Sequence, residues 1–194
     1  MFKKKLLCPL LMMLLVVITA VTVSPSVAAG NQLVDIQEAT WAEQAIVEMC
    51  AGGIITGYPD GYFRPYNNVT RVEAVTMLIR VMGLEERAKE KENAYVDYNT
   101  PPDLTWGRGY IIMGVERGML DKHSLDRFLV SQPATRLEVA ALLYHALDLE
   151  AGGGSLTFDD AGQIPADYRE CVAAMVKNNI MEGLPGNVFG PNDN

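Results

Sequence analysis

Residues 57–73 read GYPDGYFRPYNNVTRVE, and they hold the strongest structural signals in the chain. Its first half is dense in glycine, proline and aromatic residues, which is typical of a structured loop. Its second half ends in Thr70 and Glu73, spaced as a capping box in which each side chain satisfies a backbone N–H at a helix start. The stretch therefore predicts an ordered loop that leads directly into a well-capped helix.

An apolar stripe follows the cap and comprises Val72, Val75, Met77, Leu78, Val81 and Met82. An isolated helix cannot bury such a stripe, so the helix must pack against other elements. Upstream, residues 41–49 place apolar side chains at three- and four-residue steps, which predicts a first helix. Gly52 and Gly53 should end that helix, because glycine tolerates the left-handed turn at a helix terminus. The local unit is therefore helix, loop, helix.

The unit occurs again at an offset of 65 residues, where residues 135–138 form another Thr-Arg-x-Glu. A weaker third copy follows, and each copy opens with an apolar residue and an aspartate: Val34-Asp35, Val96-Asp97 and Phe158-Asp159. A fixed internal period is the signature of a repeat architecture. We expect an all-α fold of three helix-loop-helix repeats whose second helices pack around a pseudo-threefold axis.

The expected segments are a signal peptide over 1–29 and repeats over 30–84, 94–149 and 156–194. The first of these has a basic start, an apolar run and small residues at its end, as export signals do. Its apolar run is short for a membrane span of roughly 20 residues, which favours cleavage over a retained anchor. A third Thr-Arg-x-Glu would begin at position 196, so we expect either a longer parent protein or an incomplete third repeat. The charged residues 85–93 and the glycine-rich residues 151–155 are expected to be linkers.

Charge and cysteine content exclude several classes of function. Removing residues 1–29 takes away three lysines and no acid, which lowers the formal net charge from −8 to −11. Such a surface disfavours nucleic acid and anionic membrane as partners. Export permits a disulfide, but Cys50 and Cys171 occupy unequal places in the repeats, so two thiols are expected. Motifs of hydrolases, metalloproteases and phosphate-binding loops are missing from the sequence, and we expect no enzyme, catalytic residue, metal or cofactor.

The run from Asp35 to Glu73 closely resembles the S-layer homology repeat. The matching residues are Asp35, Trp41-Ala42, Ala45-Ile46, Gly53-Ile54, Gly57-Tyr58-Pro59-Asp60-Gly61, Phe63-Arg64-Pro65 and Thr70-Arg71-Val72-Glu73. The second unit departs from the pattern at its loop, residues 122–126, and the third has no counterpart of the tryptophan. The resemblance implies a secreted protein of the cell wall or S-layer that binds secondary cell-wall polymer. In other relatives it implies binding of a peptidoglycan-linked group.

The polymer that the resemblance implies is typically a glycan carrying pyruvate ketals, whose carboxylate a planar guanidinium can take with two parallel hydrogen bonds. Arg71 and Arg136 follow helix N-caps, where unpaired N–H groups also favour an anion. The alternative for both is an ordinary ion pair within the protein. The other candidate ligand-binding residues are Asp35, Asp97, Trp41, Trp106, Gly57, Tyr58 and Asp60.

Each of these candidates has a structural alternative. The aspartates either accept sugar hydroxyls or form turns, the tryptophans either stack on a sugar or lie in the core, and the loop residues either approach the ligand or merely connect helices. The function expected is non-covalent anchoring of an exported protein to the cell wall. The alternatives are an assembly module of the envelope with a decayed glycan site, or a tether for an enzyme domain further along the gene. The oligomeric state is left open.

Overall fold

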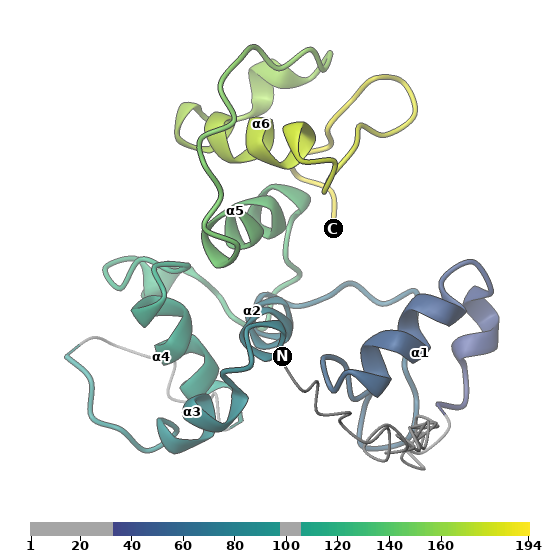
Figure 1. The fold of residues 1–194 in the computed structure, drawn as a ribbon, viewed down its shortest axis with the longest axis vertical. Helices are drawn as coiled ribbons and strands as arrows, with labels where there is room; N and C mark the ends of the chain where they lie inside the picture. The colour runs from purple at the N-terminus through teal and green to yellow at the C-terminus, as the bar shows by residue number, and fades with distance from the viewer. Residues whose placement is uncertain (1–32, 98–105) are drawn as a thin grey trace, which may run out of the picture. The chain divides into compact units, whose positions relative to one another are not determined.

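A computed structural model describes residues 33–97 and 106–194, and within these ranges the fold is all-α, as expected. Its helices, shown in Figure 1, are α1 (Glu43–Ala51), α2 (Arg71–Val81), α3 (Glu85–Glu90), α4 (Arg108–Glu116), α5 (Arg136–Ala146) and α6 (Arg169–Lys177). Short 3-10 turns occur at Ile36–Ala39, Leu125–Arg127, Ala161–Gln163 and Ala166–Tyr168. The expected signal peptide lies outside the described residues.

Both α2 and α5 begin with the predicted capping box. The Thr70 hydroxyl accepts from the Glu73 N–H, and the Glu73 carboxylate accepts from the Thr70 N–H at 2.8 Å. Thr135 and Glu138 repeat this arrangement at the start of α5, where the return bond measures 2.9 Å. Each box satisfies two N–H groups that a helix start leaves without partners.

The next N–H groups of α2 and α5 are bound by carbonyls from a later segment of the chain. The bonds run from Arg71 to Gln132, from Val72 to Val130, from Arg136 to Asp193 and from Leu137 to Pro191. The segment before α5 thus closes the start of α2, and the segment after α6 closes the start of α5. The helix starts therefore lack the open N–H groups that were expected to favour an anion.

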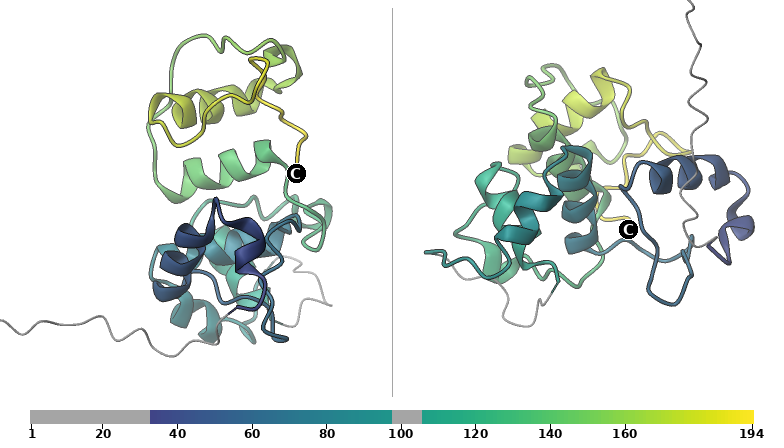
Figure 2. Two further views of the ribbon diagram at one scale, coloured as in Figure 1. Left: turned by 90° about the vertical axis from the view of Figure 1, so that its right-hand side faces the viewer. Right: turned by 60° about the horizontal axis from the view of Figure 1, so that its bottom comes forward.

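Two hydrophobic clusters hold the helices together. The first is centred on α2 and α4, with Ile79 and Ile111 fully buried, and it includes Leu142 of α5. The second joins α5 to α6, and Phe189 lies fully buried in it. Figure 2 shows α5 and α6 side by side. Because α5 contributes to both clusters, it connects α6 to α2. The described residues hold two capped helices in contact, α2 and α5, and the packing of three such units stays a prediction.

Residues 85–93 are not a linker, contrary to the sequence-based expectation, because residues 85–90 form α3 and pack on α4. Ala88 has no exposed surface, and a side chain on Gly109 of α4 would lie 1.8 Å from the Ala88 carbonyl oxygen. The charges that suggested a linker occupy mostly the outward positions of the helix. The small Ala88 and the bare backbone of Gly109 let α3 pack closely on α4.

The first helix also differs from its prediction. It begins at Glu43 rather than at Trp41, and the Trp41 side chain is 81% exposed, so Trp41 does not belong to the core. Ile46 is the residue of α1 that is buried. The predicted end is confirmed, because Gly52 caps the helix and Gly53 has a φ of +70°. Cys50 and Cys171 are both free thiols, as expected.

Candidate functional site

Asp35 fixes the loop of residues 57–65, which was predicted from the sequence. Its Oδ1 accepts the Phe63 N–H and its Oδ2 accepts the Arg64 N–H, both at 2.7 Å. Arg64 is thereby held at a φ of +59°, a conformation that non-glycine residues seldom adopt. Burial would raise the pKa of the Asp35 carboxyl, but the hydrogen bonds to it prevail and lower it. With each oxygen bound to the backbone, Asp35 performs the turn-forming role of its two alternatives.

Asp160 forms the same clamp after α5, where the sequence pattern pointed to Asp159. Its oxygens accept the N–H groups of Phe189 and Gly190, each at 2.8 Å, and Gly190 has a φ of +68°. The alignment of Asp159 with Asp35 was wrong by one residue. Asp97 forms a different contact: its side chain is 72% exposed and lies 3.3 Å from the Lys122 ammonium.

Side chains of residues 57–64 attach the clamped loop to α2. The Tyr58 hydroxyl donates to Glu73 Oε1 at 3.1 Å, and the Arg64 guanidinium lies 4.3 Å from the centre of the Tyr58 ring. Asp60 forms an ion pair with Arg64 and accepts the Tyr62 N–H, so its carboxylate is already used by the loop. Burial and the neighbouring Glu73 raise the pKa of the Tyr58 hydroxyl, which keeps it protonated as a donor.

A cavity of about 550 Å³ lies beside this loop and α2. Its lining consists of residues 54–59, 63–65, 67–69, 73, 76, 77, 80 and 106. Gly57, Tyr58 and Trp106, all predicted ligand-binding residues, are among them. Asp35, Asp60, Asp97, Trp41, Arg71 and Arg136 are not. The volume falls within the range typical of small-molecule pockets.

The wall that α2 contributes was missed by the sequence analysis. Glu73, Thr76, Met77 and Arg80 are spaced three and four residues apart, so they share one face of the helix. Thr76 is 4% exposed, and its hydroxyl oxygen has no hydrogen-bond partner among the described residues. The sequence did contain a signal for this wall, because Thr76 and Arg80 are polar residues within a largely apolar helix.

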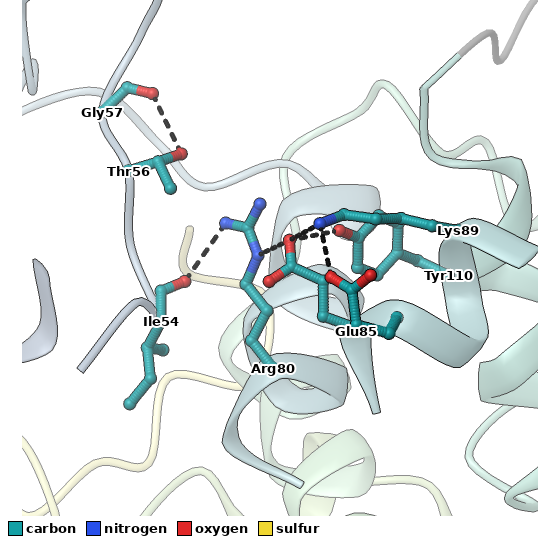
Figure 3. Close-up of polar contacts among 8 residues, drawn as sticks. Ile54, Thr56, Gly57, Arg80, Glu85, Lys89 and Tyr110 are labelled. Atoms are coloured by element: carbon teal, nitrogen blue, oxygen red, sulfur yellow. Dashed lines mark hydrogen bonds and ion pairs between the residues drawn. The ribbon is translucent and has the colours of Figure 1, made fainter. Parts of the chain in front are cut away.

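Arg80 is held from two sides, as Figure 3 shows. Its Nε donates to Glu85 Oε1 at 3.1 Å, and its Nη1 donates to the Ile54 carbonyl at 3.3 Å. The same Glu85 oxygen accepts the Tyr110 hydroxyl at 2.8 Å. Burial would raise the pKa of Glu85, but the Tyr110 hydrogen bond and the Arg80 charge lower it. The carboxylate thus stays ionised as an anchor for the arginine.

The two arginines predicted to bind the ligand have different surroundings. Arg71 grips Glu138 of α5 through two parallel bonds, Nε to Oε2 at 2.9 Å and Nη2 to Oε1 at 2.8 Å. This is the ion-pair alternative, which leaves a ligand-binding role for Arg71 as a prediction only. Arg136 donates to the Glu182 carbonyl and lies 5.1 Å from the centre of the Phe189 ring. Its Nε is buried and has no partner within the described ranges.

Residues 33–97 and 106–194 bring together no group of three histidine, cysteine or acidic side chains that could hold a metal ion. Across the same ranges, every helix is too short or too polar to span a membrane.

Fold and cavity together define a class: a small all-helical module in which aspartate-clamped loops lie against capped helices. Residues 34–75 and 157–194 match the model of the S-layer homology domain, and the chain belongs to this family.

Several bacterial proteins are similar to this chain. The surface-layer 125 kDa protein of Lysinibacillus sphaericus is 26% identical over 83% of this chain and 13% of its own length. The cellulosome-anchoring protein of Acetivibrio thermocellus is 27% identical over 71% of this chain and 31% of its own length. Outer membrane protein SlpA of Deinococcus radiodurans is 30% identical over 88% of this chain and 12% of its own length. The chain therefore spans less than a third of each of these relatives.

Proposed function

We propose that this chain anchors an exported protein to the cell wall by binding secondary cell-wall polymer non-covalently. Its family and its surface-layer relatives indicate a secreted protein attached to the cell surface. The expected ligand is an acidic glycan, of which pyruvate ketals would be the anionic groups. Peptidoglycan-linked groups are the other candidate ligand. The role is binding, with no chemical step.

The observation that carries this proposal is the cavity beside residues 57–64 and α2. Its loop wall is fixed before any ligand arrives, because the Asp35 clamp and the bond from Tyr58 to Glu73 hold it. A preformed wall lowers the entropy lost on binding. The segment that supplies it lies within residues 34–75, which match the S-layer homology domain.

The lining has the mixed character that a substituted sugar needs. Trp106, half exposed, offers a ring face on which the apolar side of a sugar can stack. Ile54, Phe63 and Met77 supply apolar surface for methyl groups, and Asn67 and Asn68 supply donors and acceptors for hydroxyls. One or two sugar residues would fill a cavity of about 550 Å³.

The two tryptophans provide a matched experiment. Trp106 lines the cavity, whereas Trp41 is more exposed and lies outside its lining. Wall polymer released from Bacillus licheniformis, whose S-layer protein is 30% identical over 71% of this chain, would be titrated into the chain by calorimetry. We expect Trp106→Ala to weaken binding about tenfold, as loss of a stacked ring does, and Trp41→Ala to change it little. Equal losses would move the site toward Trp41. No binding of this polymer, or of polymer from Lysinibacillus sphaericus, by the parent chain would refute the proposed function.

A second candidate function, assembly of the envelope without glycan binding, is favoured by the ion pair between Arg71 and Glu138. In this pair the Arg71 guanidinium binds a residue of the chain itself, whereas the anchoring hypothesis assigned it to the ligand. Sedimentation velocity without polymer discriminates the two: a concentration-dependent oligomer that ignores polymer supports assembly. A species that changes only when polymer is added supports anchoring.

The three-repeat architecture is part of the same proposal. The matching capping boxes of α2 and α5, and the matching clamps of Asp35 and Asp160, support a repeated unit. We propose that a third capped helix would pack against α5 in the way that α5 packs against α2. Its glutamate would then bind Arg136, as Glu138 binds Arg71.

A further inference from the structure

Arg80 lies at the end of α2, in the wall of the cavity, and the family resemblance assigned it no role. It follows Thr76 by four residues, so the two side chains lie on one face of the helix. The side chain is 17% exposed, which is low for an arginine and shows that the guanidinium is packed rather than extended into solvent. A positive charge is therefore fixed at the cavity wall.

The geometry of the guanidinium leaves one edge open. Nε is bound to Glu85 and Nη1 to the Ile54 carbonyl, while Nη2 has no partner within the described residues. Figure 3 shows the guanidinium between the Ile54 carbonyl and Glu85, and Ile54, Thr56, Gly57 and Arg80 all line the cavity. Guanidinium donors are coplanar and fixed relative to one another, so holding two of them orients the third.

The positive charge of Arg80 is only partly neutralised. Its partner Glu85 uses the same oxygen, Oε1, to accept the Tyr110 hydroxyl, and this oxygen lies 3.7 Å from the Lys89 ammonium. The negative charge of Glu85 is therefore divided between two cations, Arg80 and Lys89. The other charged lining residues are already paired: Glu73 accepts from Tyr58 and Thr70, and Arg64 pairs with Asp60. Among the described residues, Asp60 pairs with no cation other than Arg64, whereas Glu85 is shared with Lys89, so Arg80 is the lining cation with the less complete counter-charge.

We propose that Arg80, through its open Nη2 edge, receives the acidic group of the glycan in this cavity. This inference rests on the proposed function and names the residue that binds the anionic group of the glycan. The apolar lining beside it, including Met77 one helical turn earlier, would surround the ketal carbon and methyl group of a pyruvylated sugar. A carboxylate on a charged donor gains more than a neutral hydroxyl does, so Arg80 makes binding selective for the acidic glycan.

Two variants with opposite expectations test Arg80. Arg80→Gln removes the charge and should weaken binding of Bacillus licheniformis wall polymer about tenfold or more, as loss of a charge-assisted bond does. Glu85→Gln keeps an acceptor for Tyr110 but removes the competing carboxylate, so binding should stay equal or tighten. Arg87→Gln, an exposed change of the same charge on α3, is the control and should leave binding unchanged.

A merely structural Arg80 would give a different pattern. If Arg80 only docked α3, breaking the ion pair from either side would weaken binding alike, and that outcome overturns the proposal. Polymer whose carboxyls have been reduced to alcohols supplies the second readout. The parent chain should bind it about tenfold more weakly than native polymer, and Arg80→Gln should bind both forms equally.

Failure of this inference is distinguishable from failure of the proposed function. If Trp106→Ala abolishes binding while Arg80→Gln does not, the cavity binds glycan but Arg80 does not read its charge. If Arg80→Gln fails to fold, Arg80→Lys is used instead, because it keeps the charge but lacks the planar guanidinium. The test is then the ratio of its affinity for native polymer to its affinity for carboxyl-reduced polymer. A ratio unchanged from the parent chain overturns the role of the guanidinium edge.

Discussion

Thr76 places a buried hydroxyl in the α2 wall of the cavity. Its hydroxyl is buried without a partner among the described residues, and an unsatisfied buried hydroxyl costs about 1–3 kcal/mol. Thr76→Val replaces it with a methyl group of nearly the same shape, so we expect the free energy of unfolding to rise by about 1 kcal/mol. Urea denaturation measures this, with exposed Thr40→Val as the control. A loss of stability would show that the hydroxyl has a partner, such as an internal water.

Arg71 and Arg136 occupy the same place in their helices but differ in what they bind. Arg71→Met leaves Glu138 without its charged partner in a site where the side chains are 15% and 28% exposed. We expect a loss of about 2 kcal/mol in the free energy of unfolding, because both lost hydrogen bonds join charged groups. Arg136→Met loses one bond to a carbonyl and a ring contact, so its loss should stay below about 1 kcal/mol. Equal losses in denaturant titrations would contradict this difference.

At the scale of elements, the docking of α3 on α4 depends on a glycine. A Cβ at Gly109 would lie 1.8 Å from the Ala88 carbonyl oxygen, so Gly109→Ala must push the two helices apart. We expect a loss of about 3 kcal/mol, at the upper end of what overpacking costs. At Gly162 an added Cβ would meet no atom within 4 Å, and Gly162→Ala should change stability by less than about 0.5 kcal/mol. Thermal unfolding followed by circular dichroism compares them, and an unaffected Gly109→Ala would show that α3 is loosely attached.

Local signals allowed the capped helices to be predicted, and contacts between elements escaped prediction. Thr70 and Glu73 satisfy each other within one turn, so four residues contain the whole signal. Which face of α2 meets the loop depends on the bond from Tyr58 to Glu73, in a loop that Asp35 fixes from 28 residues away, and Arg80 was missed for that reason. Asp159 was predicted in place of Asp160, because an apolar-Asp pair does not reveal which of two adjacent carboxylates reaches the loop. Trp41 was assigned to a helix that starts two residues later.

For the whole molecule, the two aspartate clamps contribute to the response to acid, together with Glu85 and Asp121, whose pKa values are also lowered. The pKa values of Asp35 and Asp160 are lowered in the fold because, although burial would raise them, each carboxylate accepts two backbone N–H groups. A lowered pKa contributes stability above the ordinary value of 3.8, and this stability is lost as pH falls through the folded value. We expect the melting temperature to be flat above about pH 5 and to fall below it.

The double variant Asp35→Asn, Asp160→Asn should melt lower at neutral pH and lose less on acidification than the parent chain. Calorimetric melts between pH 7 and pH 3 check this, with the exposed Asp126→Asn as the control. A double variant with the full acid sensitivity of the parent would show that other carboxylates control it.

The net charge of the whole chain governs how binding should depend on salt. A chain of formal charge −8 repels an acidic polymer at long range, so attraction has to come from paired groups inside the cavity. Raising sodium chloride from about 0.05 M to 0.5 M shortens the screening length well below the size of the domain and removes the repulsion. Contacts such as the one proposed for Arg80 act over a hydrogen-bond distance in a partly shielded site and are screened much less. Affinity for the wall polymer should therefore stay level or rise by a few fold across this range. A fall of a hundredfold, as seen when basic surfaces release counterions from a polyanion, would show that an extended cationic surface, rather than this cavity, holds the wall.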